Sequence, residues 1–202
     1  MRHYGHFFLG GGFIPDFDEE EGGAIKFWRS GQLILGYRYK LKVLNFYALG
    51  AEVHYRYTKY FFDDDEENPF DPDNPLSFFE GEKRHFLENH GIGLEIYQRI
   101  NIGKRGNSLG FYIDTGFRGQ WNISDIEQAV FIIDDDNSAY GKSRIKNRRL
   151  NYTESFSYGP SARIGYDHYI LYAHYRLSDY FKTDSFSIPE LPRLMLGFQF
   201  GF

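Results

Sequence analysis

Charged side chains recur at every second position in several segments of this sequence, as expected of residues that share one face of a β-strand. Arginine guanidinium groups bind carboxylates through paired hydrogen bonds, so charges of both signs can neutralise one another in an interior. We therefore predict a buried ion-pair network of Glu52, His54, Arg56, Glu95, Arg99, Asp114, Arg118, Arg163, His174, Arg176 and Arg193. A narrow conduction path or a proton-linked switch is the alternative use of these groups.

Eight segments show this alternation, and each is at least about as long as a tilted membrane strand of roughly 9 to 11 residues. They span residues 4–14, 25–39, 45–60, 86–101, 109–123, 152–166, 169–178 and 192–202. In the third segment, for example, Leu49 and Val53 oppose Glu52 and Arg56. Each predicted strand thus has one apolar or aromatic face and one face of charged, polar or small residues.

The connections between these strands alternate between long and short. Residues 15–24, 61–85, 124–151 and 179–192 form long polar connections, whereas 40–44, 102–108 and 167–168 are short. All the short connections fall on the same side as both termini, which is typical of outer-membrane barrels. We predict an all-β fold: one domain over residues 1–202, forming an eight-stranded antiparallel up-and-down transmembrane β-barrel. A soluble lipocalin-like or jelly-roll protein is the alternative.

The composition favours the same fold class. Aromatic residues make up 20% of the chain, with 17 Tyr and 21 Phe, which suits aromatic girdles at two membrane interfaces. No segment approaches ~18 consecutive apolar residues, so a helical membrane span is excluded. The chain has no cysteine, which excludes disulfides and thiolate metal sites, and its net charge of −5 argues against nucleic-acid binding. We expect no cofactor.

The end of the sequence is its most specific feature. Phe198, Phe200 and Phe202 alternate along the last strand, and this ending resembles the C-terminal signal read by the barrel-assembly machinery. Over its full length the chain resembles the small eight-stranded outer-membrane barrels of the OmpA-like and OmpX-like class, and the stretch 175–181 looks like PorT-type porin-like barrels. The resemblance implies an integral protein of the Gram-negative outer membrane with periplasmic termini. Residues 1–14 show no secretory signal, so we expect the numbering to start at the mature chain.

Charged clusters of one sign lie in the predicted long connections. Acidic residues gather at 63–67, at Asp71 and Asp73, and at 134–136, but none follows the spacing of a calcium loop, which favours a solvated surface. The third long connection carries Lys142, Arg144, Lys146, Arg148 and Arg149. On an outer surface these cations suit pairing with lipopolysaccharide phosphates or with an acidic neighbouring subunit.

Histidines close to an acidic residue are the candidates for a catalytic site in this sequence. Small outer-membrane barrels include lipid deacylases, which carry an adjacent His-Ser pair on a lipid-facing strand together with an acidic residue. The nearest approach here is the stretch 84–91, which has His85, Glu88 and His90 but no adjacent serine. We therefore expect a non-enzymatic protein with no catalytic, cofactor-binding or metal-binding residues.

The expected function is that of an accessory or scaffolding subunit of an outer-membrane assembly, translocation or secretion complex, in contact with membrane lipid and other subunits. The alternative is a self-standing surface barrel for adhesion or membrane integrity, and a lipid-modifying enzyme comes third. Apolar residues in the predicted long connections are too many to leave in water. They can form a lid or dock to a partner, and they comprise Phe61, Phe62, Phe70, Phe78, Phe79 and residues 130–133.

Overall fold

The computed structural model describes residues 3–15, 25, 29–62, 82–102, 110–135, 138–148, 150–182 and 190–202, and the statements below concern these residues. They contain nine strands: β1 (His3–Phe13), β2 (Gly31–Lys42), β3 (Tyr47–Phe61), β4 (Glu82–Ile102), β5 (Phe111–Asp135), β6 (Ser138–Arg148), β7 (Phe156–Tyr166), β8 (Tyr169–Tyr175) and β9 (Leu194–Gly201). Within the described ranges no helix is long and apolar enough to cross a membrane.

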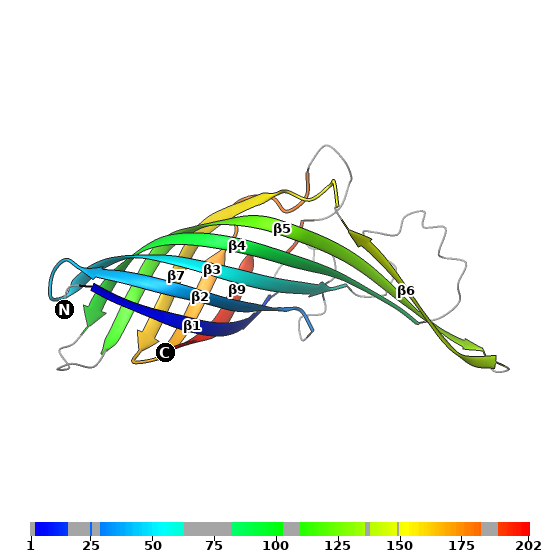
Figure 1. Cartoon of the computed structure of the whole chain (residues 1–202), viewed down its shortest axis with the longest axis horizontal. Helices are drawn as coiled ribbons and strands as arrows, with labels where there is room; N and C mark the ends of the chain where they lie inside the picture. Colours follow the sequence, from blue (N-terminus) through cyan, green and yellow to red (C-terminus); the bar gives the residue numbers. More distant parts are fainter. Residues whose placement is uncertain are drawn as a thin grey trace.

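Eight of these strands form a closed antiparallel barrel, which confirms the predicted fold class (Figure 1). Neighbours in the chain are neighbours in the barrel, except that β5 pairs with β7 as well as with β4. The barrel closes where β1 pairs with β9, from Phe8 opposite Gly201 to Phe13 opposite Leu196. Closure leaves no open edge in the ring, so every ring strand is hydrogen-bonded on both sides.

The period-two pattern of the sequence is the pattern of burial in the barrel. Along β7, exposed residues such as Tyr158 and Ile164 alternate strictly with buried ones such as Ser161 and Arg163. A β-bulge in β5 shifts its register against β4 between His90 and Gly91. Bulges of this kind increase the local twist and change which side chains face inward beyond them.

The prediction of a loop over residues 124–151 was wrong. β5 continues to Asp135 and turns back into β6, which pairs with it from Ile126 opposite Arg148 onward. β4 also begins earlier than predicted, at Glu82, and pairs with β5 as far as Ile132. Residues 82–88, 126–135 and 138–148 thus form a three-stranded ribbon that projects beyond the barrel (Figure 1).

Several other predicted strand ends also differ from the observed ones. The second strand begins at Gly31 instead of residue 25, since Ile25 makes only an isolated bridge to Phe62. The sixth predicted strand begins at Phe156 instead of residue 152. Both termini and the β2–β3 and β7–β8 turns lie at the end of the barrel away from the ribbon (Figure 1).

The apolar core is a cap at the ribbon end of the barrel. Its members come from the upper ends of several strands and from the segments after them: Ile14, Ile25, Tyr60, Phe62, Leu87, Leu150, Tyr180, Phe181, Leu191 and Met195. Phe62, which was predicted to belong to a lid or to dock to a partner, is one of them. The rest of the interior is mainly polar, which reverses the usual arrangement of a water-soluble protein.

Candidate functional site

Arg163 is the centre of a buried ion-pair network inside the barrel. Its guanidinium contacts three carboxylates: Nη1 lies 2.7 Å from Glu52 Oε2, Nη2 lies 2.7 Å from Glu95 Oε1, and Nε lies 3.3 Å from Asp114 Oδ2. These residues come from β7, β3, β4 and β5, which face one another across the lumen. The side chains are at most 1% exposed. The contacts therefore cross-link four strands through the interior.

Each carboxylate of this network also binds a second arginine. Asp114 accepts two hydrogen bonds from Arg99, at 2.6 and 2.7 Å, in the bidentate geometry favoured by guanidinium groups. Glu95 accepts one of 2.9 Å from Arg118 Nε. We call the whole set, which couples these charges through shared carboxylates, the carboxylate network: Arg38, Glu52, Glu95, Arg99, Asp114, Arg118 and Arg163.

Arg38 belongs to this network but was absent from the predicted set. Its Nε and Nη2 donate to Glu52 Oε2 at 2.9 and 2.6 Å, and Nη2 also donates to Gln199 Oε1 at 2.8 Å. The same alternation that marked the other residues could have identified it, since it lies on the inward face of β2. Aromatic rings complete the packing, with the Arg99 guanidinium 3.5 Å from the ring centroid of Tyr112.

The remaining predicted residues lie at other levels of the interior. His54 Nδ1 is 3.1 Å from Glu52 Oε1, whereas Arg56 and His174 contact no carboxylate among the described residues. Arg176, nearer the cap, donates to Glu190 Oε1 at 2.6 Å. Arg193, which was predicted to face inward, lies at the rim, where it pairs with the exposed Asp179 at 2.6 Å.

Asp125 organises a second polar cluster beneath the apolar cap. It accepts hydrogen bonds of 2.6 Å from Asn89 and Tyr180 and of 2.9 Å from Thr153. Burial and the nearby Asp125 carboxylate hold the pKa of Tyr180 well above its ordinary value, so its hydroxyl keeps the proton that it donates. This cluster ties β4 and β5 to the segment that leads into β7.

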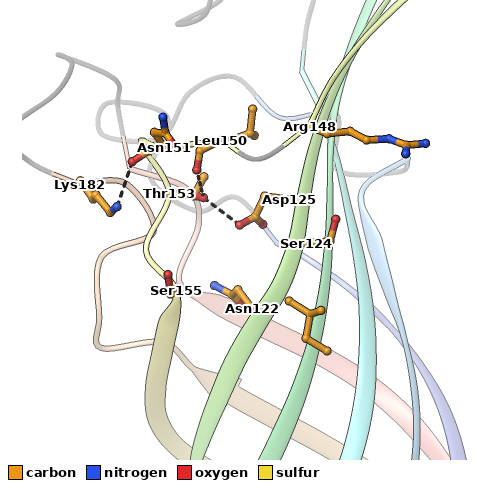
Figure 2. A pocket seen from close by; sticks show the side chains of 10 residues that line it. Asn122, Ser124, Asp125, Arg148, Leu150, Asn151, Thr153, Ser155 and Lys182 are labelled. Atoms are coloured by element: carbon orange, nitrogen blue, oxygen red, sulfur yellow. Dashed lines mark hydrogen bonds between the residues drawn. The ribbon is translucent and has the colours of Figure 1, made fainter.

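A polar hollow of about 390 Å³ opens beside this cluster (Figure 2). Lys182 reaches across it and donates to the Asn151 backbone carbonyl at 3.0 Å. Arg148 also lines it but points away from the other side chains in Figure 2. The Asp125 carboxylate at its inner side is already hydrogen-bonded, so the hollow supplies no converging set of free charges.

The outer surface of the barrel is apolar. The described residues include 36 exposed large apolar or aromatic side chains, most of them on the strands of the barrel, and Ile96, Trp121 and Leu171 are each more than 60% exposed. Leu49 and Val53, which were predicted to lie on the apolar face of their strand, belong to this set, as do Leu94 and Phe117. A soluble monomer rarely exposes contiguous apolar surface on this scale. We refer to this surface as the apolar belt.

The predicted assembly signal lies at the closing seam. Phe198 and Phe200 are exposed on β9, and their ring centroids lie 5.9 and 5.6 Å from that of Tyr169 on β8, in a tilted and an edge-to-face arrangement respectively. Phe202 is 62% exposed, and its backbone N–H donates to the Phe7 carbonyl at 2.9 Å. The three rings therefore lie on the outside of the barrel, next to β1 and β8.

The predicted basic cluster lies on β6. Arg144, Lys146 and Arg148 are exposed and alternate, so they share one face of the ribbon, opposite Val130, Gln128 and Ile126 of β5. The Lys142 side chain and Arg149 lie outside the described residues, as do Phe70, Phe78, Phe79, the acidic residues 63–67, Asp71, Asp73 and the side chains of 131–136.

The histidines considered for catalysis lie where β4 enters the ribbon. His85 Nε2 is 2.9 Å from Glu127 Oε1, and the Tyr152 hydroxyl donates to Glu127 Oε2 at 3.0 Å. Burial alone would raise the pKa of Glu127, but hydrogen bonds from His85 and Tyr152 hold this pKa below its ordinary value. His90 contacts the Tyr55 hydroxyl at 2.6 Å. Glu127 and Tyr152 were not among the predicted site residues.

No group of three or more potential metal ligands occurs among the residues that the structure describes. No protein-family model matches this chain, and no curated protein is recognisably similar to it in sequence.

Proposed function

We propose that this chain is an integral outer-membrane β-barrel that serves as a non-enzymatic accessory or scaffolding subunit of an assembly, translocation or secretion complex. The observation that carries the proposal is the inverted distribution of side chains, with the apolar belt outside and the carboxylate network inside. Lipid is the solvent that makes this distribution favourable, and a closed barrel satisfies its backbone hydrogen bonds there.

The filled interior supports a scaffolding role over that of a channel. An eight-stranded barrel is just wide enough for its inward side chains to fill it. Here four arginines and three carboxylates of the carboxylate network are cross-linked in the lumen, and the apolar cap lies above them. Charged groups tied to one another in this way fill the part of the lumen that a solute would have to cross.

The ribbon supports an interaction with neighbours. It projects beyond the barrel, and within the described residues β6 pairs only with β5, so no described strand covers its second edge. An uncovered strand edge can receive a strand from another protein. Arg144, Lys146 and Arg148 stand on this strand and suit lipopolysaccharide phosphates or an acidic neighbouring subunit.

Membrane insertion is tested by placing a charge in the apolar belt. Leu94 is 58% exposed, and Leu94→Arg should cost ~2 to 4 kcal/mol if it faces the middle of a bilayer. The measurement is urea unfolding of the barrel in lipid vesicles, followed by the heat-dependent shift in electrophoretic mobility. Ile145→Arg on the ribbon is the control and should change stability little. Equal, small effects of both substitutions would contradict a lipid-facing belt.

The scaffolding role is tested by shortening the ribbon. Val130 and Arg144 are paired across the β5–β6 hairpin, so an Asn-Gly turn can replace residues 131–143. We expect the shortened protein to form a heat-modifiable barrel but to lose subunits that co-purify with the unaltered chain from solubilised membranes. The same co-purifying subunits with both chains would contradict docking through the ribbon. A chain that purifies alone would favour the self-standing surface barrel.

A further inference from the structure

Arg56 carries a buried charge that the carboxylate network does not neutralise. The residue is 2% exposed and points inward from β3, between the network and the apolar cap. The one hydrogen bond that Arg56 makes to a described residue runs from Nη1 to Met195 Sδ at 3.3 Å, and a thioether is a weak, uncharged acceptor. Nε has no acceptor among the described residues.

The groups around Arg56 are also short of hydrogen-bond partners. His174 lies directly opposite Met195 across the β8–β9 pair and is 1% exposed, yet both of its ring nitrogens lack a partner within the described part of the chain. Arg118 Nη1 is also buried and has no hydrogen-bond partner among the described residues. The charge of Arg118 interacts electrostatically with both Arg56 and His174. Donors from β3, β5 and β8 thus gather at one level of the lumen.

The acidic groups of the interior are already engaged elsewhere. The carboxylate network and Arg56 together contain five arginines, at positions 38, 56, 99, 118 and 163, against three carboxylates, at positions 52, 95 and 114. Nearer the cap, Glu190 is bound to Arg176, and Asp125 accepts from Asn89, Tyr180 and Thr153. With Arg176, Glu190 and Asp125 included, six arginines face five carboxylates, which leaves one positive charge in excess. Among the described residues, Arg56 is the arginine of this set without an acidic partner.

An uncompensated buried charge is strongly unfavourable, and arginine does not relieve it by losing its proton under ordinary conditions. A water molecule would supply a hydrogen bond but no charge. A small anion would supply both, and it would accept from the guanidinium of Arg56, from a ring N–H of His174 and from Arg118 Nη1. We propose that the barrel binds a monatomic anion, chloride in ordinary solution, between Arg56 and His174.

The test is the dependence of stability on chloride. The unaltered protein is unfolded with urea in vesicles at constant ionic strength, while sodium gluconate is replaced stepwise by sodium chloride. If chloride binds only the folded barrel, the folded-to-unfolded ratio should rise about tenfold for each tenfold increase in chloride above the dissociation constant. Gluconate is too large for a closed lumen. Equal stability in both salts would overturn the proposal.

Two variants and one further measurement assign the effect to this site. Arg56→Met should abolish the chloride dependence, whereas Arg148→Met, which removes an exposed arginine from β6, should leave it unchanged. Retained dependence in Arg56→Met would overturn the proposal. If that variant does not fold, bromide-soaked crystals of the unaltered protein decide. An anomalous peak between Arg56 and His174 would support the site, and peaks only at surface cations would overturn it.

Discussion

Replacing Glu52 with glutamine removes one charge from the carboxylate network while nearly preserving its shape. Glu52 is 1% exposed and binds Arg38 at 2.6 Å and Arg163 at 2.7 Å. Arg163 keeps two other carboxylates in the variant, but Arg38 keeps only uncharged acceptors, the amide oxygen of Gln199 and the amide oxygen introduced at position 52. The substitution therefore leaves the Arg38 guanidinium buried without an acidic partner.

The cost follows from that isolated charge. Breaking a buried ion pair by removing one partner costs ~3 to 5 kcal/mol, which is a large share of a typical unfolding free energy of ~5 to 15 kcal/mol. The chain offers a matched control in Arg193 and Asp179, which are also 2.6 Å apart but whose side chains are 32% and 55% exposed. Asp179→Asn should cost only ~0 to 1 kcal/mol, because water screens and solvates the pair.

The assay is reversible urea unfolding in lipid vesicles, with Glu52→Gln, Asp179→Asn and the double variant Arg38→Met/Glu52→Gln compared in one salt. We expect the double variant to recover part of the loss, since it also removes the stranded guanidinium. Glu52→Gln within about 1 kcal/mol of the unaltered protein, or equal to Asp179→Asn, would refute the view that buried pairing holds the barrel together.

Three further outcomes are expected. Because the pKa of Glu127 is lowered in the fold, the ionised carboxylate stabilises the ribbon fully above the unfolded pKa of about 4.3. This stabilisation is lost as the pH falls through the folded pKa, so amide hydrogen exchange in β5 and β6 should become faster between pH ~6 and pH ~3. Glu127→Gln should make the exchange rates less dependent on pH over this range. A Cβ on Gly159 would lie 1.8 Å from a backbone carbonyl oxygen of β8, whereas a Cβ on Gly11 meets nothing closer than 3.8 Å. Gly159→Ala should therefore lower the unfolding free energy by ~1 to 3 kcal/mol or more, and with it the urea midpoint, whereas Gly11→Ala should leave the midpoint unchanged. Equal midpoints for the two variants would contradict the close approach at Gly159. Deleting Phe202 removes a hydrogen bond between the chain end and β1 and shortens the predicted assembly signal, so little heat-modifiable barrel should reach the membrane. An unchanged amount of barrel in the membrane would contradict the roles of Phe202 in closing the barrel and in assembly.

The ribbon shows where reading the sequence fell short. Residues 129–133 form a continuous apolar run, residues 134–138 are rich in turn-forming Asp, Asn and Ser, and charged residues alternate from Lys142 to Lys146. These are signals of a β-hairpin. An eight-stranded barrel does not require this hairpin, because β6 is an additional strand that pairs with β5 outside the ring.

Along the regular parts of the ring strands, the sequence by itself determined which side chains share the inward face, because a strand alternates its side chains with a period of two whatever it pairs with. Glu52 and Arg163 could therefore be placed in the interior from the alternation alone, on β3 and β7. Only the tertiary structure decided that these two residues, 111 positions apart in the sequence, form an ion pair. It also decided that Arg163 contacts three carboxylates and that Arg56 contacts none among the described residues. Those pairings depend on strand register, on the bulge in β5 and on closure of β1 against β9, which set the height of each charge in the lumen and leave no local trace in the sequence.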